Sequence, residues 1–68
     1  MSTELTKELR RIRKAAGMSQ MDIATRVGVS LLTIQLWERG ISQPNAENAE
    51  KLEQTLKELN KGAADAKN

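Results

Sequence analysis

Residues 19–40, SQMDIATRVGVSLLTIQLWERG, predict two short helices joined by a tight turn. Ser19 can cap the first helix, because a serine hydroxyl accepts a hydrogen bond from a free backbone N–H of the first turn. Gly28 ends that helix, and Ser30 can cap a second one that runs to Gly40. Few arrangements other than two helices packed at an angle fit this pattern.

A helix, a glycine-containing turn and a second helix are the sequence form of a helix-turn-helix motif. In such motifs the second helix lies in the major groove of DNA. Here its outward face is unusual, since it carries Leu31, Leu32, Gln35 and Leu36 where polar side chains are expected. The motif therefore indicates nucleic acid, whereas the surface that would read it is largely apolar.

Composition limits the class of protein. The chain has 68 residues, which suffice for one small domain, and 38% of them are hydrophobic with a single aromatic residue and no strand-like alternation. It has no Cys and no His, which excludes disulfides, thiolate or imidazole metal sites and Cys-His or Ser-His catalysis. No apolar run is long enough to span a membrane. We therefore expect an all-α, cytoplasmic, non-enzymatic protein that needs no metal or cofactor.

Charge is distributed unevenly along the chain. Residues 1–40 hold seven Lys and Arg against four acids, whereas residues 41–68 hold four Lys against five acids. The net charge of +2 is too small to indicate nucleic acid by itself, but the basic part coincides with the two-helix motif. The group Arg10, Arg11 and Lys14 indicates a solvated helix face more readily than a DNA contact.

Two longer helices are predicted around the motif. Over residues 3–16, Leu5, Leu9, Ile12 and Ala16 share one face, and over residues 46–60 the same holds for Ala49, Leu52, Leu56 and Leu59. The second stripe either packs on its own chain, which we favour, or gives Leu56 and Leu59 to a partner helix in a homodimer. Residues 1–60 form the predicted domain and residues 61–68 a disordered tail.

The run from Leu9 to Leu56 resembles the Cro and phage-repressor, or xenobiotic-response-element (XRE), family of helix-turn-helix proteins. The matching elements are Leu9-Arg10-x-Ile12-Arg13, Gly17-Met18-Ser19-Gln20, Ile23-Ala24-x-x-Val27-Gly28-Val29-Ser30, Thr33-Ile34-x-x-Trp37-Glu38-Arg39-Gly40, Pro44, Leu52 and Leu56. The resemblance implies a lambda-repressor-like domain of four helices, or five as in the family, with the fourth extended. It also implies a small DNA-binding transcriptional regulator, a repressor by type, from a bacterium, phage or mobile element.

Residue roles follow from the resemblance only where residues match. Ser19, Gln20 and Arg39 occupy phosphate-contacting positions, and Gln20 also braces the second helix of the motif. Arg13 and Glu38 match a structural ion pair. The positions that face base edges are those of Ser30, Leu31, Leu32, Thr33, Gln35 and Leu36. The implied partner is double-stranded DNA, bound by a homodimer.

The leucines leave three interpretations open. They can pack against thymine methyl groups, with Gln35 as the one strong hydrogen-bonding reader. Alternatively, Leu31, Leu32 and Leu36, together with Met21, form an exposed apolar face that binds a protein partner. In the third interpretation they are buried, either by an unusual tilt of the helix or by the C-terminal segment. We favour DNA binding, because a scaffold used only for protein contact has no need of Ser19, Gln20 and Arg39.

Overall fold

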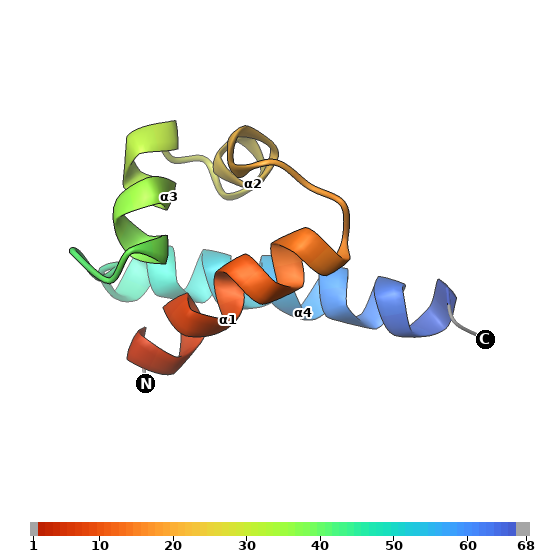
Figure 1. Cartoon of the computed structure of the whole chain (residues 1–68). Coiled ribbons are helices and arrows are strands. Elements are labelled where there is room, and N and C mark those ends of the chain that lie inside the picture. Colours follow the sequence, from red (N-terminus) through yellow and green to blue (C-terminus); the bar gives the residue numbers. More distant parts are fainter. Residues whose placement is uncertain (1, 67–68) are drawn as a thin grey trace.

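The computed structural model describes residues 2–66, and the side-chain surroundings of residues 6–61. These residues form four helices: α1 (Ser2–Ala15), α2 (Gln20–Val27), α3 (Leu31–Glu38) and α4 (Ala46–Ala66). Figure 1 shows α4 as the long base of the molecule, with α1 lying across it and α2 and α3 above. No strand occurs between residues 2 and 66, so the predicted all-α, four-helix architecture is confirmed.

The two motif helices begin and end as their sequence predicts. Ser19 caps α2 and Ser30 caps α3, each by accepting a hydrogen bond from the backbone N–H three residues on. Gly28 follows α2 with φ at +88°, a left-handed angle that costs a residue with a Cβ about 1–2 kcal/mol. The turn between the helices therefore depends on glycine at this position.

One fully buried side chain from each helix meets at the centre of the core. These residues are Leu9, Ile23, Ile34 and Leu52. Burying each of them contributes about 1.5–3 kcal/mol relative to exposure. Trp37, at 3% exposure, joins this cluster, as predicted for a core residue rather than a base-stacking one. The core thus holds α3 from behind and leaves its opposite side free.

The end of α4 follows the favoured prediction in one respect and differs from the prediction in another. Leu56 is only 3% exposed within its own chain, so packing on its own chain is confirmed for this residue and the alternative of a partner helix is wrong. The helix also continues to Ala66 instead of ending near Asn60, because lysine and alanine favour helix and Gly62 costs only about 1 kcal/mol.

Two other predictions fall outside the part of the chain that the structure describes. The division between a domain at 1–60 and a disordered tail stays a prediction, since residues 67–68 and the side chains after residue 61 are not described. The predicted burial of Leu5 likewise concerns a side chain that is not described.

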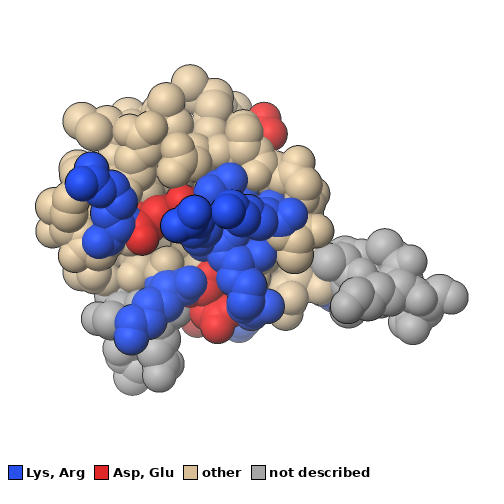
Figure 2. All heavy atoms as spheres, in the orientation of Figure 1, with Lys and Arg blue, Asp and Glu red and all other residues tan. Residues whose placement is uncertain are grey.

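Several basic side chains gather over α1. Figure 2 shows Lys and Arg concentrated over α1 in the view of Figure 1. Lys7, Arg10, Arg11 and Lys14 are all exposed there, whereas Arg13 on the same helix is buried. The α1 helix therefore separates its charges, with one arginine directed into the molecule and the others into solvent.

Candidate nucleic-acid interface

A buried ion pair joins α1 to the end of α3. Arg13 donates from Nε to Glu38 Oε2 at 2.7 Å and from Nη2 to Glu38 Oε1 at 3.1 Å. The two side chains are 11% and 4% exposed. A third N–H of Arg13 donates to the Met18 carbonyl at 3.0 Å, in the segment just before α2. Arg13 and Glu38 therefore form the structural pair that the family resemblance implies, and Arg13 also fixes the entry to α2.

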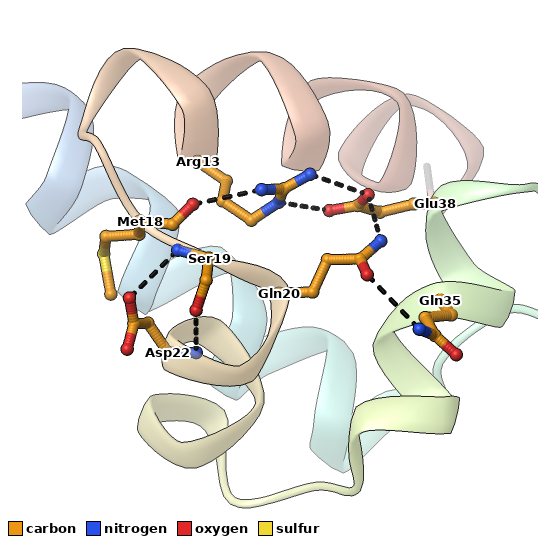
Figure 3. Close-up of polar contacts among 7 residues, drawn as sticks. All are labelled: Arg13, Met18, Ser19, Gln20, Asp22, Gln35 and Glu38. Atoms are coloured by element: carbon orange, nitrogen blue, oxygen red, sulfur yellow. Dashed lines mark hydrogen bonds and ion pairs between the residues drawn. The ribbon is translucent and has the colours of Figure 1, made fainter.

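Gln20, the first residue of α2, extends this network toward α3. Its Nε2 donates to Glu38 Oε1 at 3.0 Å, and its Oε1 accepts from Gln35 Nε2 at 3.3 Å (Figure 3). A carboxylate can only accept hydrogen bonds, so the amide of Gln20 must present nitrogen to Glu38 and oxygen to Gln35. The orientation of the Gln20 amide is therefore fixed by which of its atoms can donate and which can accept.

The same logic fixes the orientation of Gln35. Because Gln20 offers it an acceptor, Gln35 must present its nitrogen there, and its oxygen lies on the side away from Gln20 (Figure 3). Gln35 is half-buried, so its free groups lie at the edge of the outward face of α3. One carbonyl oxygen and one remaining N–H are left for a ligand. Sequence reasoning singled out both glutamines but missed their bond, because it depends on the angle between α2 and α3.

The network also sets the charge of Glu38. Burial alone would raise the pKa of this carboxyl group, but hydrogen bonds from Arg13 and Gln20 oppose it. Together with the positive charges of Arg13 and Arg10, they hold the pKa of Glu38 below its ordinary value. Glu38 therefore stays ionised at neutral pH, and its carboxylate accepts hydrogen bonds from both Arg13 and Gln20.

The start of α2 is closed by a reciprocal cap. The Ser19 hydroxyl accepts from the Asp22 backbone N–H at 3.0 Å, and the Asp22 carboxylate accepts from the Ser19 backbone N–H at 2.9 Å. The hydrogen bond from the Ser19 backbone N–H, and a further one from the Ser19 hydroxyl, lower the pKa of Asp22. Ser19 itself is exposed. Helix N-termini of this kind suit a phosphate group.

Fewer side chains on the outward face of α3 are fully exposed than the sequence predicts. Leu32 is 62% exposed, whereas Leu31, Thr33, Gln35 and Leu36 are half-buried. Ser30 and Arg39 are exposed at the two ends of the helix, and the Ser30 hydroxyl bonds to that of Thr33 at 2.9 Å. The interpretation in which all the leucines are buried is therefore wrong for Leu32.

Two further apolar side chains are exposed within the motif or directly after it. Met21 on α2 is 54% exposed and Ile41, directly after α3, is 60% exposed. Among residues 6–61, they and Leu32 are the large hydrophobic side chains that solvent reaches most. Each belongs to the motif or to its immediate end.

Other chemistry finds little support in this part of the chain. Among the described residues, no three acidic side chains, His or Cys come together as metal ligands. No described helix has the length and apolar character needed to cross a bilayer. What the fold brings together is a capped helix start, an amide network and an outward helix face.

This geometry defines a helix-turn-helix domain, and comparison with known families agrees. A family model described as helix-turn-helix matches residues 9–59, about three quarters of the chain. The chain belongs to this family, whose type is the XRE, or Cro and phage-repressor, helix-turn-helix. It is thus a DNA-binding regulator in the general sense that the family defines. No curated protein and no solved structure matches the chain.

Proposed function

We propose that this protein is a sequence-specific transcriptional regulator that places α3 in the major groove as a homodimer. The observation that carries the proposal is the amide network from Arg13 and Glu38 through Gln20 to Gln35. It holds the start of α2 and the outward edge of α3 in one rigid unit. A reading surface has to be preorganised in this way for base contacts to discriminate.

Phosphate contacts position the protein on the duplex. Gln20 keeps one N–H of its amide free after donating to Glu38, and Ser19 is exposed at the start of α2. Arg39, exposed at the end of α3, supplies a charge at the opposite end of the motif. These three residues clamp the backbone on either side of the bases that α3 meets.

Base reading then falls to Gln35 and Leu32. A glutamine that offers an oxygen and an N–H matches adenine, whose N6 donates and whose N7 accepts in the major groove. Leu32 has no polar group, but its exposed side chain can pack on the methyl group of thymine. Ser30 and Thr33 assist as small polar contacts. The half-site we infer is therefore rich in A·T pairs, with further discrimination from DNA shape.

A homodimer follows from the size of the reading surface. One short helix contacts only a few base pairs, so useful specificity needs two half-sites about one helical turn apart. The experiment is a selection from randomised duplexes at low salt, with sedimentation of the complex to fix its stoichiometry. Enrichment of paired, A·T-rich half-sites bound by two chains supports the proposal. Absence of any enriched sequence contradicts it.

The second candidate function is protein binding through the leucine face. The exposure of Leu32 and Met21 favours it, since contiguous apolar surface on a small domain commonly marks an interface. Under this alternative, Leu32→Glu or Leu36→Glu abolishes self-association or capture of a partner while the fold is kept. A variant that loses DNA and keeps its protein partner rules this alternative out.

A further inference from the structure

Three exposed cations on α1 form a strip along one face of the helix. Lys7, Arg10 and Lys14 are exposed and spaced three and four residues apart, so they share one face of the helix. Among the side chains that the structure describes, none of the three makes an ion pair. Arg11 beside them differs, because it is paired with Glu8. We call Lys7, Arg10 and Lys14 the α1 strip.

The α1 strip borders the start of α2. Arg13, which lies between Arg10 and Lys14 in the sequence, reaches inward to Glu38 and to the Met18 carbonyl. Glu38 in turn holds Gln20. Arg10 is close enough for its charge to help lower the pKa of Glu38. Arg10 therefore lies near the network that holds Gln20, and Lys14 lies in the last turn of α1, the end that leads into α2. Figure 2 shows Lys and Arg gathered over this helix.

The length of the strip fits a nucleic-acid backbone. From Lys7 to Lys14 an α-helix rises about 10 Å, at 1.5 Å per residue. A strip of this length, carrying long and flexible side chains, can reach neighbouring phosphates of one DNA strand. A helix face that contacts only solvent does not need its cations to follow one another along a single line. On α4, by contrast, Lys51 is paired with Glu47 and the helix carries acids along its length.

We propose that the α1 strip contacts the DNA backbone beside the phosphate held at the start of α2, and so extends the footprint beyond the bases that α3 reads. This inference rests on the proposed function, since it needs α3 to be docked on a duplex. The strip adds affinity and salt dependence without adding sequence preference, because phosphates carry no base identity.

The test is the salt dependence of binding to a duplex enriched by selection. Neutralising the strip with Lys7→Gln, Arg10→Gln and Lys14→Gln removes three charges. A matched control, Lys51→Gln, Lys57→Gln and Lys61→Gln on α4, removes the same number from exposed positions. The slope of log K against log salt falls by about 0.9 for each phosphate that the protein no longer neutralises. We expect a fall of about 2–3 for the strip variant, no comparable fall for the control, and unchanged base preference in both.

The outcomes separate the two proposals. If wild type binds and the strip variant keeps the slope of the α4 control, the α1 strip makes no backbone contact and the inference is refuted. If wild type binds no duplex at low salt, the proposed function itself fails. The single variant Lys7→Gln, farthest along the strip from the buried Arg13, guards against loss of folding. It is expected to lower the slope by about 0.9 with unchanged thermal unfolding.

Discussion

The buried pair of Arg13 and Glu38 gives the sharpest prediction about stability. Arg13→Met leaves a carboxylate whose side chain is 4% exposed without its guanidinium partner, and Glu38→Gln leaves a buried guanidinium without its counter-charge. Removing one member of a buried pair costs about 3–5 kcal/mol. The low end applies here, about 3 kcal/mol each, because Gln20 still donates to the carboxylate and the Met18 carbonyl still accepts from Arg13.

That loss is large for so small a domain. At about 0.05–0.15 kcal/mol per residue, a chain of 68 residues has about 3–10 kcal/mol of stability in total. A loss of 3 kcal/mol lowers the midpoint of thermal unfolding by about 12–24 °C, at 4–8 °C per kcal/mol. The double variant should lose far less than the sum of the two singles, because no unpaired charge remains. We expect a coupling free energy of about 2–3 kcal/mol.

Urea unfolding of the four proteins in this double-mutant cycle measures the coupling. The matched control is the exposed pair of Glu8 and Arg11 on α1, whose side chains are 47% and 63% exposed. Its variants Glu8→Gln and Arg11→Met should each cost less than about 1 kcal/mol. If the losses of unfolding free energy for Arg13→Met and Glu38→Gln simply add, and neither is larger than the losses of the control variants, the network does not hold the two motif helices together and the assignment is refuted.

Three further predictions concern the same region. The free energy of unfolding should fall in acid, because the pKa of Glu38 is lower in the folded protein than in the unfolded chain. The contribution of Glu38 to stability is complete above its unfolded pKa of about 4.3 and is lost as the pH falls through its lower folded pKa. Urea titrations at several pH values should show that Glu38→Gln flattens this loss, and an unchanged acid profile contradicts it. Gly28→Ala should lower the stability measured by thermal unfolding by about 1–2 kcal/mol, because the site has φ at +88° although there is open space around the added Cβ. Gly28→Asn should cost less, since asparagine adopts this left-handed conformation more readily. Equal losses would argue against backbone strain as the cause. Gln20→Met should weaken DNA binding and relax the preference for adenine opposite Gln35, as measured by repeating the duplex selection; an unchanged preference shows that the amide network does not orient Gln35.

Much of this arrangement could be predicted from local sequence. Ser19, Gly28 and Ser30 mark the ends of the motif helices, and each acts through a short-range backbone bond or angle. The apolar spacing of Leu9 and Leu52 identifies their core faces, because a helix repeats every 3.6 residues. The pairing of Arg13 with Glu38 came from the family resemblance and not from spacing.

What could not be predicted depends on how the helices meet. The bond between Gln20 and Gln35 joins residues on two elements, so neither helix alone reveals it. The spacing of the leucines on α3 does not show that Leu31 and Leu36 are half-buried while Leu32 is exposed. Periodicity favoured the packing of Leu56 on its own chain but left a partner helix open, and only the packed structure decides between the two.

The most direct test of the central claim is the effect of one charge on the outward face of α3. Leu32→Glu places a carboxylate at the most exposed of the three leucines of α3, where it would meet phosphates and base edges. Gln54→Glu adds the same charge at an exposed site on α4 and serves as the control. Fluorescence anisotropy against the selected duplex, with circular dichroism to verify the fold, compares both with wild type. We predict that Leu32→Glu loses binding by at least tenfold, about 1.4 kcal/mol, while Gln54→Glu keeps it. Equal affinity of the two folded variants would contradict the placement of α3 in the major groove.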